Sequence, residues 1–217
     1  MEKSKEEKEV KFLGLANEKP HVTLLVGRKG SGKTSLLLKL LKDKAGYRNV
    51  YQEIIIVSPT FRLQSQWETI SGEGITVYEQ FSEEILNKVY NEQQPHINSL
   101  LILDDNGDDL KRINQKVFNK LISNSRHLNC SIIALCQKMS QAPTILRSNT
   151  DVFAVFSACS IRESEILWSE VGLLDKKRFH EIFTDATKDQ YSAFVCSMES
   201  GKLHFYKNFQ TEYKINK

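Results

Sequence analysis

The sequence predicts an α/β fold in which helices cover both faces of a parallel sheet and a β-hairpin closes the C-terminal end. Two observations carry this prediction. Short, continuously apolar runs such as "HVTLLV" and "SLLILD" are typical of strands buried on both faces of a parallel sheet. These runs alternate with amphipathic helical segments, which parallel strands need as crossover connections.

Length and composition favour a single globular domain. The 217 residues suffice for one substantial core, and 40% of them are hydrophobic while 26% are charged. We expect residues 1–19 to form a charged, solvated tail and residues 20–217 to form one domain. No apolar run approaches the roughly 20 residues that cross a bilayer, and the charged N-terminus lacks the pattern of a secretory signal.

Net charge and cysteine content bear on the binding partners and on the cellular compartment that we expect. The formal net charge of +3 is too small to identify a nucleic-acid partner. The four cysteines form no CxxC pair, and Cys130 and Cys136 fall in one predicted buried strand, where they act as small core residues. A reducing, cytoplasm-like compartment is the simplest expectation.

The elements follow from apolar periodicity and from turn and cap signals. Ser82 before two glutamates predicts a helix N-cap, and Pro59 and Gly201 mark a strand end and a hairpin turn. In chain order we expect a strand at 21–26, a helix from 33 to about 44, a strand at 53–60, an extended segment at 74–80, a helix at 82–93, a strand at 99–105, a helix at about 110–125, a strand at 130–137, a turn at Pro143, a strand at 151–157, helices at 162–172 and 175–187, and a hairpin at 191–209 that turns at 199–201.

The segment "GRKGSGKT" fits the phosphate-loop pattern GxxxxGK[ST], with a predicted strand before it and a helix after it. Its glycines let backbone N–H groups point at phosphate oxygens, and a side chain at Gly32 would obstruct that approach. We expect Lys33 to contact the β- and γ-phosphates of ATP, and the hydroxyl of Thr34 to hold Mg²⁺ at the positive end of the helix. The predicted nucleotide-binding residues are Gly27, Arg28, Lys29, Gly30, Ser31, Gly32, Lys33, Thr34 and Ser35.

The strand "SLLILDD" ends in two carboxylates, which is the Walker B form. We expect Asp104 to hold Mg²⁺ together with Thr34, and Asp105 to orient the attacking water or accept its proton. Many motor ATPases have glutamate at the second position, and the aspartate here is one methylene shorter. The alternative role for Asp105 is to cap the turn into "NGDD".

The next strand, "CSIIALCQ", ends in Gln137, which we expect to contact the γ-phosphate or the attacking water. Such a polar strand end beside the acidic one distinguishes motor-type ATPases from small kinases and GTPases. Arg126 and Arg147 lie in loops that flank this strand. Either can reach the nucleotide of a neighbouring subunit as a catalytic guanidinium, with the other forming a structural ion pair, and we favour Arg126.

Together these segments resemble the FtsK/HerA superfamily, and most closely the genome-packaging ATPases of poxviruses, other large eukaryotic DNA viruses and virophages. The resemblance rests on "LLVGRKGSGKTSLL", "IIIVSPTF", "LLILDD", "SRHLNCSIIALCQ" and "ILRSNTDVFAVF" in this order, and covers nearly the whole chain after Lys19. It implies a sheet of order 5-1-4-3-2 and a homo-oligomeric ring, a pentamer or hexamer, that drives double-stranded DNA into a preformed capsid with ATP. It also implies capsid proteins as partners, and the host cytoplasm or the virion as the location. The residues that match the family's motifs are Lys33, Thr34, Asp104, Asp105, Gln137, Arg126 and Arg147.

Several alternatives stay open at this stage. A small-molecule kinase has a similar length, but it needs an arginine-rich lid, and Arg147, Arg162 and Arg178 are scattered. A nucleotide-gated assembly protein with weak hydrolysis would tolerate an aspartate at position 105. Two basic segments are candidates for DNA contact and would otherwise be solvated helix faces: Lys111, Arg112 and Lys116, and Lys176, Lys177 and Arg178.

Overall fold

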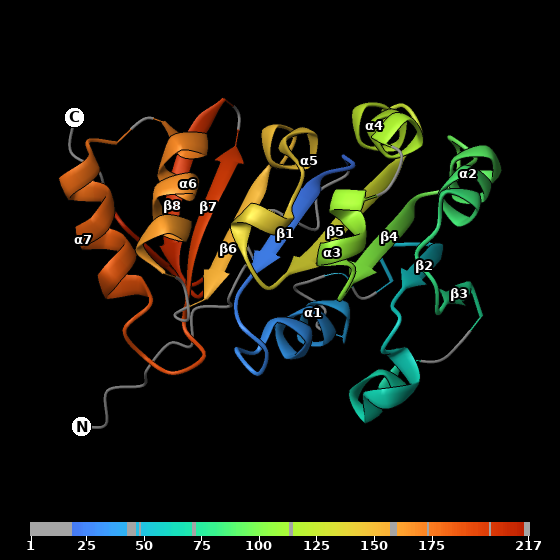
Figure 1. Cartoon of the computed structure of the whole chain (residues 1–217), viewed down its shortest axis with the longest axis horizontal. Coiled ribbons are helices and arrows are strands. Elements are labelled where there is room, and N and C mark those ends of the chain that lie inside the picture. Colours follow the sequence, from blue (N-terminus) through green and yellow to red (C-terminus); the bar gives the residue numbers. More distant parts are fainter. Residues whose placement is uncertain are drawn as a thin grey trace, which may run out of the picture.

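The computed structural model describes residues 19–42, 47, 49–70, 73–112, 115–156, 160–172, 174–199 and 201–214. The predicted tail falls almost wholly on residues 1–18, which lie outside the described part. Within that part, one nine-stranded sheet runs through the molecule in the order β3-β2-β4-β5-β1-β6-β7-β8-β9 (Figure 1). Its strands are β1 (Val22–Val26), β2 (Glu53–Val57), β3 (Ile75–Tyr78), β4 (Ser99–Asp104), β5 (Cys130–Cys136), β6 (Val152–Phe156), β7 (Ala193–Glu199), β8 (Lys202–Lys207) and β9 (Thr211–Glu212).

The central strands confirm the predicted parallel sheet. The strands β6, β1, β5, β4 and β2 are all parallel, and numbering these five along the chain gives the order 5-1-4-3-2. Strand β3 extends one edge in parallel with β2. The predicted hairpin is β7–β8, with Glu199 opposite Lys202, and it adds antiparallel strands to the other edge. The sequence did not predict β9, which pairs with β8 at the outer edge.

Helices connect the strands, and most lie where the sequence predicts them. The Ser82 hydroxyl caps α2 by accepting the N–H of Ile85 at 3.2 Å, and Asp175 caps α7 through the N–H groups of Lys177 and Arg178. The helices are α1 (Lys33–Lys42), α2 (Glu83–Glu92), α3 (Gly107–Arg112), α4 (Gln115–Asn124), α5 (Thr144–Ser148), α6 (Ile161–Val171) and α7 (Lys176–Ala186), with 3₁₀ turns η1 (Phe61–Leu63), η2 (Ser65–Thr69) and η3 (Met139–Gln141).

Two expectations are corrected by these bounds. The helix expected over about 110–125 begins earlier, at Gly107, where the carbonyl of Asn106 accepts the N–H of Leu110. It is described as α3 up to Arg112 and as α4 from Gln115, and residues 113–114 between them lie outside the described part. The turn expected at Pro143 contains the short helix α5, which proline permits because its fixed φ suits a helix start. Among the described residues, no helix is both long and apolar enough to cross a membrane.

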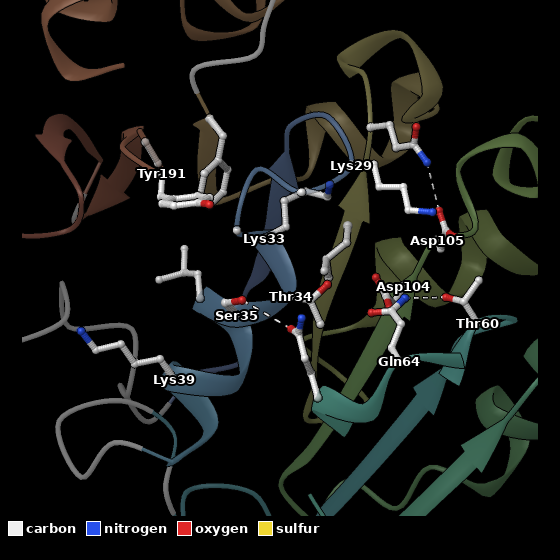
Figure 2. A pocket seen from close by; sticks show the side chains of 18 of the residues that line it. Lys29, Lys33, Thr34, Ser35, Lys39, Thr60, Gln64, Asp104, Asp105 and Tyr191 are labelled. Atoms are coloured by element: carbon white, nitrogen blue, oxygen red, sulfur yellow. Dashed lines mark hydrogen bonds between the residues drawn. The ribbon is translucent and has the colours of Figure 1, made fainter. Parts of the chain in front are cut away.

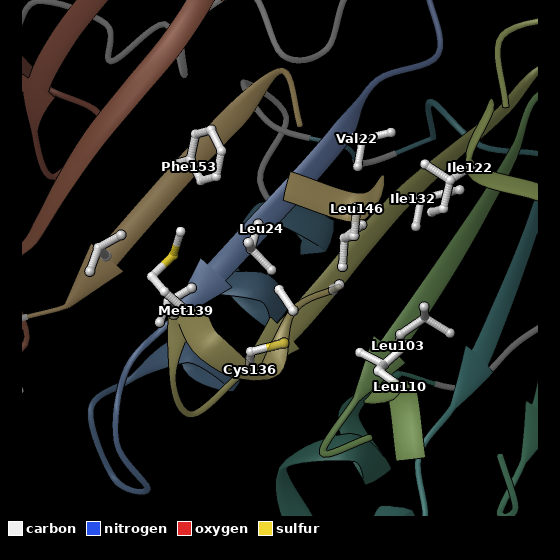
Figure 3. Packing of buried hydrophobic residues seen from close by; sticks show 14 of the residues in the cluster. Val22, Leu24, Leu103, Leu110, Ile122, Ile132, Cys136, Met139, Leu146 and Phe153 are labelled. Atoms are coloured by element: carbon white, nitrogen blue, oxygen red, sulfur yellow. The ribbon is translucent and has the colours of Figure 1, made fainter. Parts of the chain in front are cut away.

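The two faces of the sheet are covered unequally. Helices α2 to α7 and the turn η3 pack over one face, and α1 with the turns η1 and η2 covers the other (Figure 1). Consecutive residues of a strand alternate between these layers, so Leu24 of β1 faces the larger layer and Leu25 faces α1. Figure 3 shows Leu146 of α5 beside Leu24 and Ile132 in the larger layer. Both faces of the sheet are therefore covered by apolar layers.

Candidate nucleotide-binding site

The phosphate loop follows β1 at the carboxyl edge of the sheet, where the parallel strands β4 and β5 also end. A pocket of about 950 Å³ opens at this edge (Figure 2). Its lining joins the loop and α1 to the ends of β4 and β5, and to segments on either side of the sheet. Side chains after different strands thus meet at one cavity, as ligand sites of open α/β sheets do.

Glycine is required at different positions of the loop for different structural reasons. A Cβ on Gly27 would lie 2.5 Å from Ser31 Oγ and 2.8 Å from Phe156 Cβ, so this position has no room for a side chain. Gly32 has φ +101, and there a Cβ would meet no protein atom closer than 3.5 Å, so its constraint is the backbone conformation. The N–H of Gly27 donates to the carbonyl of Cys136 at 3.1 Å, which ties the loop to the end of β5.

Lys33 is the first residue of α1, and its ammonium is held inside the loop. Its Nζ donates to the carbonyl oxygens of Gly27 at 2.6 Å and Arg28 at 3.2 Å. Burial lowers the pKa of Lys33, and the nearby carboxylates of Asp104 and Asp105 act in the opposite direction. A partly desolvated ammonium held only by carbonyls gains strongly from an anionic oxygen, so the loop is suited to bind a phosphate.

Most of the predicted nucleotide-binding residues face this pocket. Gly27, Arg28 and Ser31 are not part of its lining, and the Ser31 hydroxyl is buried without a hydrogen-bond partner among the described residues. The Ser35 hydroxyl donates to Gln66 Oε1 at 3.4 Å. The predicted residues that line the pocket are Lys29, Gly30, Gly32, Lys33, Thr34 and Ser35.

Asp104 ends β4 and is only 4% exposed. The Ser58 hydroxyl donates to its Oδ2 at 3.2 Å. Burial raises the pKa of Asp104, whereas the Ser58 hydroxyl and the nearby Trp67 indole oppose that rise. Trp67 is fully buried, and its place beside Asp104 depends on the turn η2, which no sequence pattern revealed.

The oxygen donors around Asp104 fit Mg²⁺. The Thr34 hydroxyl lines the same pocket as the Asp104 carboxylate (Figure 2). No group of three or more His, Cys, Asp or Glu side chains suited to a metal occurs in the described part of the chain. Mg²⁺ does not need such a group, because it is commonly held by one or two protein oxygens together with substrate phosphates and water.

Asp105 and Gln137 meet across the gap between β4 and β5. Gln137 Nε2 donates to Asp105 Oδ1 at 3.2 Å, and both side chains are exposed to the pocket. The turn after β4 is held by Asn106, whose amide donates to the carbonyls of Val57 at 2.8 Å and Asp104 at 2.9 Å. Since Asn106 stabilises the turn, the Asp105 carboxylate is left to face the pocket.

Gln141 of η3 lies outside the pocket lining but supports the end of β5, a role that the sequence did not indicate. Its Oε1 accepts the N–H groups of Gln137 at 3.0 Å and Lys138 at 3.1 Å. Its Nε2 donates to Asp108 Oδ1 of α3 at 3.3 Å. One glutamine therefore links the end of β5 to the helix that follows the acidic strand.

The two candidate arginines have different surroundings, and neither lines the pocket. Arg147 Nε pairs with Glu170 Oε1 at 2.6 Å, and both side chains are less than 20% exposed. Arg126 is 72% exposed and pairs with Asp151 at 2.9 Å. It precedes β5, so it lies at the amino edge of the sheet, opposite the phosphate loop of its own chain. Arg147 therefore has the properties of a structural ion pair, and Arg126 those of a group directed outward.

The basic segments and the scattered arginines named from the sequence do not line this pocket. Arg178 pairs with Glu181 at 3.1 Å and Lys176 with Glu165 at 2.8 Å. No arginine lines the pocket among the described residues, so that part of the chain has no arginine-rich lid of the kind that a small-molecule kinase needs. The exposed candidates for DNA contact remain predictions: Lys111, Arg112, Lys116, Lys176, Lys177 and Arg178.

Comparison with known families and relatives identifies the family to which this chain belongs. A profile of the family described as "Poxvirus A32 protein" matches residues 9–199. The DNA packaging protein OPG160 of Variola virus is 29% identical over 170 residues, which are 73% of this chain and 61% of that protein. "Uncharacterized protein 015R" of Frog virus 3 is 22% identical over 176 residues, which are 77% of this chain and 53% of that protein. The chain thus spans less than two thirds of these relatives.

Solved structures show the same fold. B204, the DNA-packaging ATPase from Sulfolobus turreted icosahedral virus, superposes with a TM-score of 0.67 at 17% identity, over 91% of this chain and 100% of that chain. The genome packaging NTPase B204 from Sulfolobus turreted icosahedral virus 2 in complex with ATP-gammaS gives a TM-score of 0.65 at 17% identity, over 87% and 97% of the two chains. These likenesses confirm the predicted fold class.

Proposed function

We propose that this chain, which belongs to the poxvirus A32 protein family, is an ATP-hydrolysing motor that moves double-stranded viral DNA into a preformed capsid. The observation that carries the proposal is the convergence of three neighbouring strand ends on one pocket. Lys33 follows β1, Asp104 ends β4 and Asp105 comes directly after it, and Gln137 follows β5. Phosphate binding, metal binding and control of the attacking water are thus available in one place.

The residues of the chain divide the work of hydrolysis. Lys33 exchanges its carbonyl partners for oxygens of the β- and γ-phosphates. Asp104 and Thr34 hold Mg²⁺, which, when bound, neutralises charge on the phosphate oxygens. Asp105 orients the attacking water or takes its proton, while Gln137 fixes the carboxylate of Asp105 and lies where the γ-phosphate ends.

Catalysis also requires a neighbouring subunit in this proposal. Arg126 lies at the sheet edge opposite its own phosphate loop, so in a ring its guanidinium serves the nucleotide of the next subunit. We propose a homo-oligomeric ring, a pentamer or a hexamer, which acts with capsid proteins in the host cytoplasm or within the virion. The DNA packaging protein OPG160 of Variola virus supports this assignment by its name and its 29% identity.

The first test is the steady-state ATPase rate over a range of protein concentrations, with and without linear double-stranded DNA. We expect DNA to stimulate the rate, and the rate to rise more steeply than linearly with protein because neighbours complete each site. Lys33→Ala should abolish turnover. A rate that ignores DNA and scales linearly with protein would count against a DNA-driven ring. Phosphoryl transfer to a nucleotide acceptor would favour the kinase alternative, and absence of turnover the assembly protein.

Catalysis between subunits is tested by mixing two inactive variants. Arg126→Ala subunits keep an intact phosphate site, and Lys33→Ala subunits keep Arg126, so mixed rings should regain part of the activity. Lys188→Ala is the matched control, because Lys188 is 58% exposed and ion-paired with Asp185, much as Arg126 is with Asp151. If Arg126→Ala alone behaves like this control, Arg126 is not the group that acts in trans.

A further inference from the structure

The nucleotide pocket extends past the phosphate loop to a second wall built by the C-terminal strands. This wall consists of Tyr191 and Ala193 at the start of β7 and of residues 208–210 between β8 and β9. Figure 2 shows Tyr191 on one side of Lys33, and Asp104 and Asp105 on the other. The hydrolytic groups and the C-terminal wall thus occupy opposite ends of one cavity.

The wall is firmly anchored to the sheet. Asn208 Oδ1 accepts the N–H of Ala193 at 2.7 Å, and the Asn208 N–H donates to the Ala193 carbonyl at 2.9 Å. The side chain of Phe209 is 2% exposed and packs in the layer beneath α1. The N–H of Gln210 closes the turn on the carbonyl of Lys207 at 3.0 Å. The position of this wall is therefore fixed by the fold before any ligand binds.

Tyr191 is the unusual member of the wall. Its ring is 60% exposed, and its Cδ1 lies 3.5 Å from the point that a Cβ on Gly32 would occupy. Its φ is +61, a conformation that bulky residues rarely adopt, and it is held there by the next residue, Ser192, whose N–H and hydroxyl both donate to the carbonyl of Asp189. An exposed aromatic ring kept in a strained backbone beside a phosphate loop indicates a binding role.

Residues with left-handed backbone collect at this pocket. Among the described non-glycine residues with positive φ, four line it: Asp105, Tyr191, Asn208 and Phe209. Asn49 and Asn129 share the conformation but do not line the pocket, and asparagine tolerates this conformation well. Because aspartate and asparagine tolerate the left-handed conformation, the strained residues of the pocket are Tyr191 and Phe209, and both belong to the C-terminal wall.

We propose that Tyr191 stacks on the base of the bound nucleoside triphosphate, with residues 208–210 forming the outer edge of the base site. This inference rests on the proposed function, which fixes the direction of the ligand. The γ-phosphate lies toward Asp105 and Gln137, so the base extends away from them, past Gly32, to the Tyr191 end. An aromatic ring recognises a base by its flat surface, so a purine, with the larger surface, binds tighter than a pyrimidine.

Equilibrium binding separates this role from phosphate binding. We would measure the dissociation constants of Mg²⁺-ATP, Mg²⁺-UTP and Mg²⁺-tripolyphosphate for the wild type, Tyr191→Phe, Tyr191→Leu and Tyr191→Ala. Stacking on an aromatic ring is worth roughly a 5- to 150-fold change in affinity. We expect Tyr191→Leu and Tyr191→Ala to lose ATP affinity by a factor in this range, with tripolyphosphate affinity unchanged within about twofold. Tyr191→Phe should bind ATP like the wild type, and the ATP-to-UTP preference should fall toward one in the other two variants.

The controls make each outcome decisive. Alanine and leucine at φ +61 are strained much as tyrosine is, and the side chain is exposed, so thermal melting should change little in any variant. Equal loss of ATP and tripolyphosphate binding, or no loss of either, would overturn the base-stacking role. If the wild type itself binds neither ligand, or if Lys33→Ala binds both as well as the wild type does, the proposed function fails and the inference fails with it.

Discussion

From the hydrogen bond between Gln137 and Asp105 we predict how substitutions of Gln137 change the hydrolysis step. Gln137 Nε2 donates to Asp105 Oδ1 at 3.2 Å, and it comes from the strand next to the one that carries the acid. Gln137→Leu removes the donor at similar volume, and Gln137→Glu replaces it with a carboxylate that faces another carboxylate. In both variants Asp105 loses the group that fixes its orientation toward the attacking water.

The size of the effect follows from this one bond. A hydrogen bond to a charged group contributes roughly 1.5–3 kcal/mol, and each 1.36 kcal/mol in the activation barrier is a factor of ten in rate. Gln137→Leu should therefore lower kcat by roughly 10- to 150-fold if the bond is kept in the transition state. Gln137→Glu should lower it further, because like charges repel at this distance. KM should stay within about twofold, since Lys33 and the phosphate loop supply the binding.

Steady-state kinetics with thermal melting as a control would decide the question. Gln137 is exposed, so we expect either substitution to change the free energy of unfolding by no more than about 0.5 kcal/mol, with a correspondingly small shift in melting temperature. Gln66→Leu is a matched control, because Gln66 lines the same pocket but bonds to Ser35 instead of Asp105. A Gln137→Leu enzyme with wild-type kcat, or with raised KM and unchanged kcat, would refute the assignment of Gln137 to the attacking water.

Three further predictions concern stability and its relation to binding. Burial raises the pKa of Asp104, so the folded state binds the carboxyl proton more tightly than the unfolded state does. Above the raised pKa the carboxylate is charged, and the free energy of unfolding is lower than at acid pH. Asp104→Asn should therefore raise the melting temperature at neutral pH, by roughly 2–4 °C per kcal/mol gained, while Mg²⁺-dependent ATP turnover is lost; the gain should vanish at acid pH, and a lower melting temperature would contradict it. Arg147→Ala leaves Glu170 half-buried without its partner and should cost roughly 1–3 kcal/mol in urea unfolding, part of which Glu170→Gln should restore; equal unfolding midpoints would show that the pair adds nothing. Gly27→Ala forces a Cβ to 2.8 Å from Phe156 Cβ and should cost roughly 1–3 kcal/mol while weakening ATP binding, so an unchanged melting curve and affinity would show that the loop yields freely.

The parts of the site that belong to a strand and the turn after it could be predicted from the sequence. Lys33, Asp104 and Gln137 each follow an apolar run, and parallel strands bring their carboxyl ends to one edge. The alternation of runs and helices predicted the layers of the fold. The order of the strands came from family resemblance, because apolar periodicity alone does not state which strands are neighbours.

Contacts between distant segments could not be predicted in this way. Gln141 reaches Asp108 across more than thirty residues, and Tyr191 approaches Gly32 from the far end of the chain. Neither contact leaves a local pattern. The aspartate at position 105, in place of the glutamate common in motor ATPases, has a backbone explanation: its φ is +58, and this left-handed conformation suits the short side chain of aspartate better.

The parts of the pocket are also synthesised in a set order on the ribosome. Residues up to Gln137 carry the phosphate loop and the hydrolytic groups, yet the opposite wall is completed only by Gln210. A chain ended before residue 208 therefore carries the reactive groups of the pocket but lacks the wall that residues 208–210 form. The full lining of the pocket is available only after these residues have been synthesised.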